Sequence, residues 1–137
     1  MVKELRTRPV ERGLYRNYLK KAEEFHETAV ENYEKERWNA CVVNAIHCAI
    51  SCCDALTVFY LGFRYAGERH EDAAELLKQT DIAKNELNDK LKHFYALISI
   101  KNRAEYEERL MFKVDAERAK KACERFLSWT KGKIGVG

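Results

Sequence analysis

Residues 38–63, WNACVVNAIHCAISCCDALTVFYLGF, decide the fold class of this chain. The segment is apolar on almost every face and contains no Lys, Arg or Glu. It is long enough to span a bilayer, but Asn44, His47, Ser51 and Asp54 fall inside it, and an Asp near the middle of a lone span would be costly in lipid. We therefore predict a central helix that is buried within a helical bundle.

The rest of the composition is typical of a single helical domain. The chain has 137 residues, of which 46% are hydrophobic, with one Pro and six Gly. So few turn-forming residues favour long helices over a meander of short strands. We predict one all-α domain over residues 1–137, with its core at about 12–131 and mobile tails at 1–11 and 132–137.

Charge and cysteine content set the expected surroundings of the protein. The net charge of +3 arises from 25 basic and 22 acidic residues that are interspersed, so no single-sign field points to nucleic acid. Four of the five Cys lie within the central segment, where pairing along one helix is geometrically poor. The N-terminal residues lack the apolar core of a signal peptide. We expect reduced thiols and a cytoplasmic protein.

Hydrophobic spacing predicts three further long helices and one short helix. Apolar residues recur at three- and four-residue steps over 15–33 and 84–109, and residues 70–79 fit a short helix. Asp115 is a suitable N-cap for the last long helix, and Gly132 lies just past its expected end. The short connections favour antiparallel neighbours. The expected architecture is an antiparallel up-and-down bundle of four long helices plus one short helix.

A polar strip crosses the apolar central segment. Its members are spaced by three, four and three residues, which aligns them on one face of a helix: Asn44, His47, Ser51 and Asp54. The strip could form the wall of a binding cleft, with His47 as an acid or base and Asp54 as an orienting carboxylate. Alternatively, the strip is the line along which a mostly buried helix meets water, or a set of satisfied hydrogen bonds between helices. For each residue taken alone, this structural interpretation is favoured over the functional one.

A second polar strip lies on the predicted helix 84–109. Tyr95, Ser99, Asn102 and Tyr106 share one face of that helix, with Arg103 beside them. The run Lys101-Asn102-Arg103 could hold a phosphate, because Arg offers a planar fork of donors and a Tyr ring can stack on a base. The Glu residues that follow allow the alternative of a solvated face with local ion pairs.

Metal chemistry is a weaker interpretation of the central segment. His47, Cys48 and Cys52 lie close together along the chain, and His and Cys are the usual zinc ligands, but their spacing is not that of a zinc motif. Free Cys is more often a small, buried packing residue. The sequence also contains no Gly-rich phosphate loop and no HExxH motif. We expect neither a metal site nor a cofactor.

Taken in order, these features resemble the HEPN family over roughly residues 15–129. The segments that carry the resemblance are YLKKAEEFHETAVENY, NAIHCAISCCDALTVFYLG, RYAGERHEDAAELL, KNRAEYEERL and VDAERAKKACERFLSW. The resemblance implies a helical domain that is associated with nucleotides, RNA and minimal nucleotidyltransferases and that often forms homodimers. It also implies a cleft near the second and third long helices, which would bring Ser51, Asp54, Arg103 and Tyr106 near one another.

The same resemblance raises the question of catalysis. Nuclease members of the family resemble metal-independent ribonucleases, with an Arg followed after four to six residues by a His near the end of the third long helix. In this chain Arg103 has no such partner, because no His follows His93. Arg64 and His70 have a suitable spacing, but we expect them in the loop after the second helix, which is the wrong place.

Three functions follow as hypotheses. The favoured one is a non-catalytic HEPN-like domain that binds a nucleotide, RNA or a nucleotidyltransferase-type partner through Asn102, Arg103, Tyr106 and the polar strip of the central segment. A toxin-like, metal-independent ribonuclease could instead use Arg103 with His47 or His70. A dimeric helical scaffold would need no ligand at either strip. A homodimer without a membrane span is expected.

Overall fold

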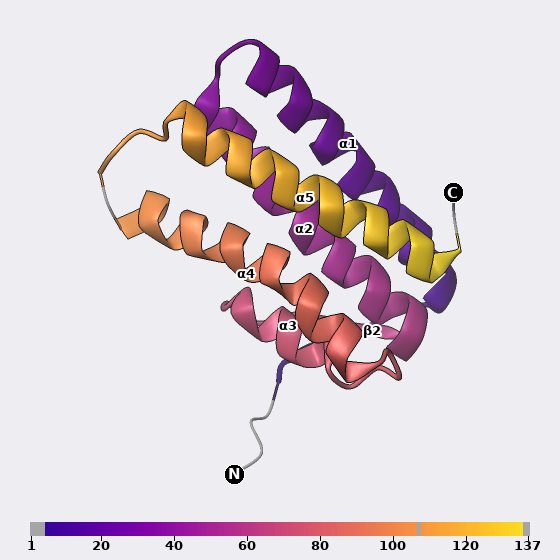
Figure 1. The fold of residues 1–137 in the computed structure, drawn as a ribbon. Coiled ribbons are helices and arrows are strands. Elements are labelled where there is room, and N and C mark those ends of the chain that lie inside the picture. The colour runs from indigo at the N-terminus through magenta and orange to yellow at the C-terminus, as the bar shows by residue number, and fades with distance from the viewer. Residues whose placement is uncertain (1–4, 107, 136–137) are drawn as a thin grey trace.

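The computed structural model confirms an all-α bundle. It describes residues 5–106 and 108–135, with the side chains of 104–106 outside the description. Four long helices, α1 (Tyr15–Glu34), α2 (Trp38–Leu61), α4 (Lys84–Tyr106) and α5 (Lys113–Ile134), pack with one short helix, α3 (Glu71–Leu77). Figure 1 shows α5 crossing in front of α2, with α1 and α4 on either side. The predicted count of four long helices and one short helix is confirmed.

Helix α2 is the central element of the bundle, as its sequence predicts. It packs against α1, α3, α4 and α5, and most of its side chains are buried. The helix is long and apolar enough to cross a membrane, but 67% of its most apolar window is buried inside the bundle. Its burial is therefore provided by the neighbouring helices, among which Leu91, Phe94 and Phe126 are fully enclosed.

The helix ends differ from their predicted positions by a few residues, and at α5 the difference has a clear cause. Asp115 is not the N-cap: α5 begins at Lys113, and the Asp115 carboxylate accepts a hydrogen bond of 2.8 Å from the backbone N–H of Phe112. The carboxylate thus satisfies a free N–H from inside the first turn. Gly132 is likewise not the terminator. It lies within α5, which ends at Ile134 and is followed by Gly135 in the left-handed conformation (φ 83°).

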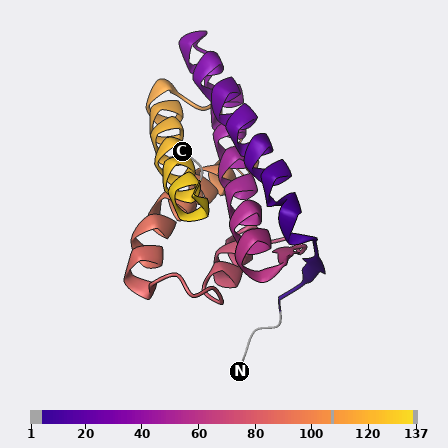
Figure 2. The same ribbon diagram turned by 90° about the vertical axis from the view of Figure 1, so that its right-hand side faces the viewer.

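The expectation of mobile tails is wrong for the described part of the N-terminus. After α2 ends at Gly62 (φ 78°), the chain extends as β2 (Phe63–Tyr65) and pairs antiparallel with β1 (Thr7–Pro9). A short 3₁₀ helix, η1 (Arg12–Leu14), connects β1 to α1. Figure 2 shows this two-stranded ribbon beside the end of α2. Each strand has only three residues, so no alternation in the sequence could reveal it.

Candidate functional site

The side chains of the polar strip on α2 have different surroundings: one bonds to the helix backbone, one contacts helix α1, and one is buried in the core. The Asn44 amide donates to the carbonyl of Ala40 one turn earlier (2.8 Å), and the His47 ring lies on the Phe25 ring of α1, with 5.3 Å between centroids. His47 is exposed, whereas Ser51 is buried. The four residues therefore share a helical face, as predicted, but they do not meet in one cavity.

Asp54 is the most perturbed member of this strip. Burial raises the pKa of its carboxyl to about 7, and the nearby positive charges of Arg64 and Lys21 oppose that rise. Asp54 lies two turns beyond His47, about 10 Å along the helix axis, on the side of α1 and β2. Its surroundings are thus distinct from those of His47.

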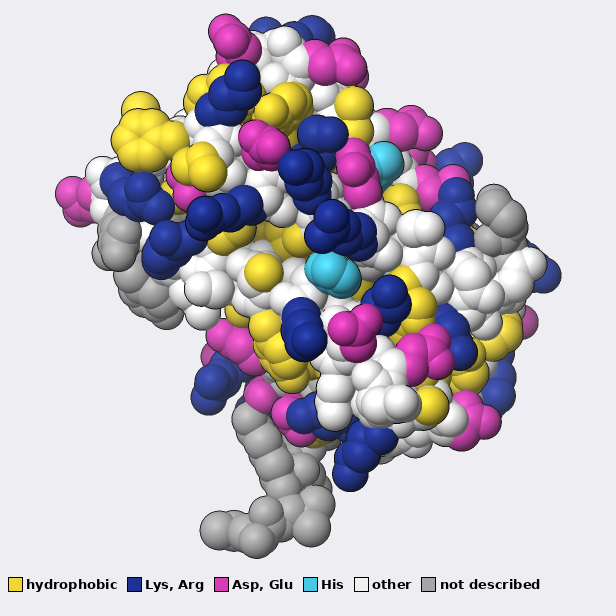
Figure 3. Space-filling view, in the orientation of Figure 1, with side chains coloured by type: hydrophobic (Ala, Val, Ile, Leu, Met, Phe, Trp, Pro, Cys, Tyr) yellow, Lys and Arg dark blue, Asp and Glu magenta, His cyan; other side chains and the backbone are white. Residues whose placement is uncertain are grey.

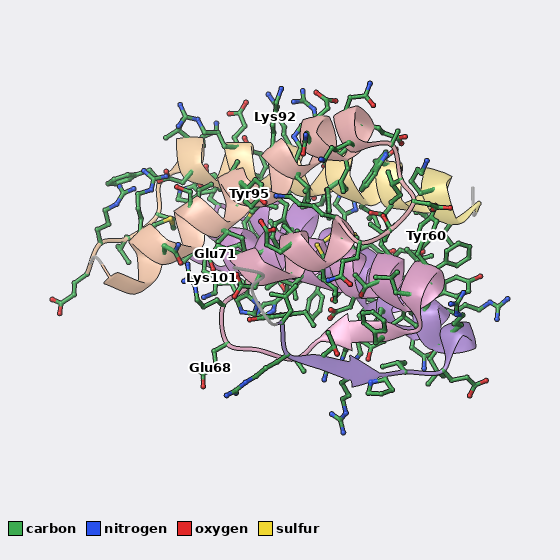
Figure 4. All side chains as sticks on the ribbon, turned by 90° about the horizontal axis from the view of Figure 1, so that it is seen from below. Tyr60, Glu68, Glu71, Lys92, Tyr95 and Lys101 are labelled. Atoms are coloured by element: carbon green, nitrogen blue, oxygen red, sulfur yellow. The ribbon has the colours of Figure 1, made fainter. Side chains whose placement is uncertain are left out.

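The last turns of α4 contact the start of α3. Asn102 donates a hydrogen bond to the Glu71 carboxylate (3.1 Å) across the two helices. Beside this bond lies an open, mainly polar cavity of about 370 Å³, which we call the α3–α4 cavity. It is lined by Glu68, Arg69, His70, Glu71, Ile98, Lys101 and Asn102. Figure 4 shows Glu71 and Lys101 next to each other on this side of the molecule.

A second cavity, of about 290 Å³, lies between α2 and the residues that precede α5. Its walls are mostly apolar, and we call it the α2–α4 cavity. It is lined by Asn39, Val42, Val43, Ile46, His47, Lys101 and Met111. The side-chain amide oxygen of Asn39 accepts a hydrogen bond of 2.9 Å from the backbone N–H of Met111, which fixes the connection after α4 against α2. Lys101 lines both cavities.

The structure therefore brings together only part of the predicted site. His47 shares a cavity with Lys101, and Asn102 shares the other with Lys101 and His70. Arg103 is exposed and lines neither cavity, and the side chain of Tyr106 lies outside the described residues. The grouping that the resemblance implied is not seen around Asp54, since its charged neighbours are Arg64 and Lys21.

His70 lies in the connection after α2, as expected, and directly precedes α3. The structure adds that this position lines the α3–α4 cavity with Lys101. Arg69 and Glu71 join it there and were not predicted as site residues. In the sequence, these residues could have been noticed as the polar run 68–71 that leads into the short helix. Only the packing of α3 on α4 shows that this run lines a cavity.

The cysteines belong to the core. All five are unpaired and buried, whereas His47 next to Cys48 is exposed, so these neighbours in sequence point to different sides of α2. Within the part of the chain that the structure describes, no three His, Cys, Asp or Glu side chains are grouped as metal ligands would be.

Comparison with models of known protein families gives a match to the HEPN domain over residues 15–133. No curated protein and no solved structure matches the chain significantly.

Proposed function

The chain belongs to the HEPN family, and on that premise we propose that it is a non-catalytic domain that binds a nucleotide or RNA at the end of α4. One observation carries the proposal. Lys101 lies between an apolar cavity of about 290 Å³ and a polar cavity of about 370 Å³. A nucleotide likewise has one part suited to an apolar cavity and one suited to a polar cavity, since its base is flat and weakly polar and its phosphate is charged.

The two cavities offer different contacts to the two parts of such a ligand. The α2–α4 cavity presents the side chains of Val42, Val43 and Ile46, against which a base can pack. Its rim carries His47, whose ring can stack on a base or donate a hydrogen bond. Lys101, which lines both cavities, is the group that would contact the phosphate of such a ligand, as a point charge.

The α3–α4 cavity adds groups suited to the rest of a nucleotide. Arg69 is a second cation for a phosphate. Glu68 and Glu71 are acceptors for ribose hydroxyls, and the Asn102 amide holds the Glu71 carboxylate in place. This mixture of charges favours a ligand with hydroxyl donors over a bare anion, because a bare anion would be repelled by both carboxylates.

A matched pair of lysine variants on α4 tests this proposal. Lys101→Gln is compared with Lys92→Gln, because Lys92 is 77% exposed on the same helix and pairs with Asp89. Binding of a nucleotide panel and of short RNA is measured calorimetrically, with chelator present. We expect Lys101→Gln to weaken binding about tenfold or more, as loss of a charge-assisted contact does, and Lys92→Gln to leave it nearly unchanged. Equal effects of the two variants, or no binding by the parent protein, would contradict the proposal.

The position of His70 favours a second candidate function, a metal-independent ribonuclease. His70 lines the same cavity as Lys101, so a general acid or base and a cation could act on one phosphodiester. RNA cleavage under chelation that is abolished by His70→Gln and retained in His26→Gln, whose histidine lines none of the described cavities, would support this candidate. RNA that binds without being cleaved would support the non-catalytic function.

We also propose that the chain forms a homodimer through the apolar surface beside the α2–α4 cavity. Val43 is 52% exposed, and Leu110 and Phe112, on either side of Met111, are 71% and 60% exposed. Exposed apolar side chains of this size gathered at one end of a bundle are typical of an interface. Sedimentation of Phe112→Ser should then show a shift toward monomer. A parent protein that is already monomeric would leave this surface to a nucleotidyltransferase-type partner.

A further inference from the structure

A third cavity lies on the opposite side of α4, where α4 packs on α5. It is an open hollow of about 390 Å³, lined by Lys90, His93, Glu124, Arg125, Ser128 and Trp129. Figure 3 shows Lys and Arg side chains gathered over α4 and α5 on this face of the molecule. His93 and Lys101 are eight residues apart, about 12 Å along the axis of α4, and no lining residue is shared with the two cavities described above.

Positive charge dominates the lining of this α4–α5 cavity, because the carboxylate among its lining residues, that of Glu124, is paired with groups outside the cavity. Glu124 lies 3.2 Å from the ammonium of Lys120 and 3.3 Å from the His26 ring. Arg125 is exposed and makes no hydrogen bond or ion pair with the described residues. Arg125 therefore directs uncompensated charge into the hollow, and Lys90, which lies 3.8 Å from the Asp89 carboxylate, adds a second cation to its lining.

The histidine in the cavity responds to that charge. Partial burial lowers the pKa of His93, and the positive charges of Arg125 and Lys90 lower it further. Asp89 on the same helix opposes this effect, and Lys92 adds to it. The cavity thus carries three groups that become mutually repulsive when His93 is protonated, and an anion bound between them would remove the repulsion.

We propose that the α4–α5 cavity is a binding site for a phosphate group, held by Arg125 and Lys90 and by His93 in its protonated form. A guanidinium, an ammonium and an imidazolium approach from two helices, and the Ser128 hydroxyl adds a fourth donor. Four donors suit a tetrahedral oxyanion, which has more acceptor oxygens than a carboxylate. The proposal concerns a different site from the nucleotide site at the end of α4 and does not depend on it.

Two sources of the phosphate are compatible with this chemistry, namely a small phosphate ester and the backbone of a nucleic acid. Trp129 forms one wall, held in place by the hydrogen bond from its indole N–H to Glu86 (2.8 Å). Arg118 lies seven residues before Arg125 on the same face of α5 and is also exposed. It could contact a second phosphate of a polymer but lies too far along the helix to contact a small ester.

Sulfate is the probe for the site itself, because its charge stays constant between about pH 5.5 and 8, the range in which histidine side chains titrate. Binding is followed by the NMR signals of the His93 ring and by calorimetry. We expect saturable binding that tightens roughly three- to tenfold as the pH falls over this range, with a matching rise in the pKa of His93. His93→Gln should abolish the pH dependence and retain the binding seen at high pH.

A pair of arginine variants separates a built site from a generally basic surface. Arg125→Gln should weaken sulfate binding about tenfold or more, whereas Arg118→Gln should change it less than about twofold. Lys101→Gln should leave the response of His93 unchanged, which keeps this test independent of the nucleotide site. Non-saturable binding, equal losses in the two arginine variants, or a pH dependence that survives His93→Gln would overturn the proposal.

The same variants identify the source of the phosphate. A nucleoside monophosphate and a single-stranded oligonucleotide are titrated in parallel. Binding of the oligonucleotide at least about tenfold more tightly, with a loss in Arg118→Gln as well as in Arg125→Gln, supports backbone binding. Equal affinity for the two probes, with a loss in Arg125→Gln alone, supports a small phosphate ester.

Discussion

Asn102 on α4 donates a hydrogen bond of 3.1 Å to Glu71 on α3, and this bond joins two residues that lie 31 positions apart in the sequence. The carboxylate of Glu71 also accepts from its own backbone N–H, and these two bonds hold its pKa below the ordinary value. Both residues line the α3–α4 cavity. The geometry of the proposed nucleotide site therefore depends on this one bond between helices.

Removal of the amide should release Glu71. In Asn102→Ala we expect the pKa of Glu71 to rise toward its usual value and the free energy of unfolding to fall by about 1 kcal/mol, the net contribution typical of one such bond. A carbon-detected NMR titration gives the pKa, and denaturant unfolding gives the free energy. Asn17→Ala on the exposed face of α1 is the control. An unchanged Glu71 titration would mean that the bond does not persist in solution.

Gly67 is the glycine whose replacement should be most harmful. A Cβ at this position would overlap the hydroxyl and ring of Tyr65, and that hydroxyl accepts a hydrogen bond of 3.1 Å from the backbone N–H of Arg69. Gly132 is the matched control. It lies exposed within α5, where a Cβ would meet nothing within 4 Å.

Opposite effects are expected from the same substitution at these two glycines. Gly67→Ala should lower the free energy of unfolding by about 1–3 kcal/mol, because the Tyr65 ring must move. Gly132→Ala should raise it by up to about 1 kcal/mol, because Ala is the better helix former. Parallel urea titrations measure both. Destabilisation by Gly132→Ala would show that α5 ends before this residue, as its sequence had indicated.

The long helices were predictable because each carries a periodic signal over many residues. The apolar run of α2 specifies both a helix and its central position, because only a place between other helices removes apolar side chains on all of its faces from water. The features that the sequence did not reveal depend on single contacts. The helix start at Lys113 rests on one bond from the Phe112 N–H to Asp115, and an Asp at N3 looks the same in sequence as an Asp at the N-cap.

The candidate site was less predictable than the fold for a related reason. Helical spacing correctly places the polar residues of α2 on one face, but it cannot show which neighbouring element that face meets. His47 lies at the rim of the α2–α4 cavity, whereas Asp54 faces Arg64 and Lys21. The position of His70 beside α4 depends on how α3 packs, which local patterns do not encode.

The thiols should be unreactive in the folded protein. Burial raises the pKa of Cys41 to about 11 and that of Cys53 well above its ordinary value, and the thiolate is the nucleophilic form. We expect iodoacetamide at about pH 8 to label none of the five buried Cys in the native state and all five in denaturant. Mass spectrometry counts the added groups. Rapid labelling of the native chain would contradict the burial of α2.

The carboxyl of Asp54 should make the stability of the protein depend on pH in an unusual direction. Its folded-state pKa is raised from 3.8 to about 7, with burial as the main cause. Below pH 4 the carboxyl is protonated in both states and costs nothing. As the pH rises from about 4 to about 7, the carboxyl ionises in the unfolded chain but stays protonated in the folded one, so stability is lost progressively over this range and not further above it.

Asp54→Asn removes this ionisation and should therefore stabilise the protein at high pH. The shift corresponds to about 4 kcal/mol at full burial, and partial access to water reduces the expected gain at pH 8 to about 2 kcal/mol, with almost no gain near pH 4. Denaturant unfolding at several pH values measures it, with Asp89→Asn as the exposed control. Destabilisation at pH 8 would mean that attraction to Arg64 and Lys21 outweighs the cost of burial. A gain would show that the chain retains Asp54 at the expense of stability, which is expected of a functional carboxylate and not of a packing residue.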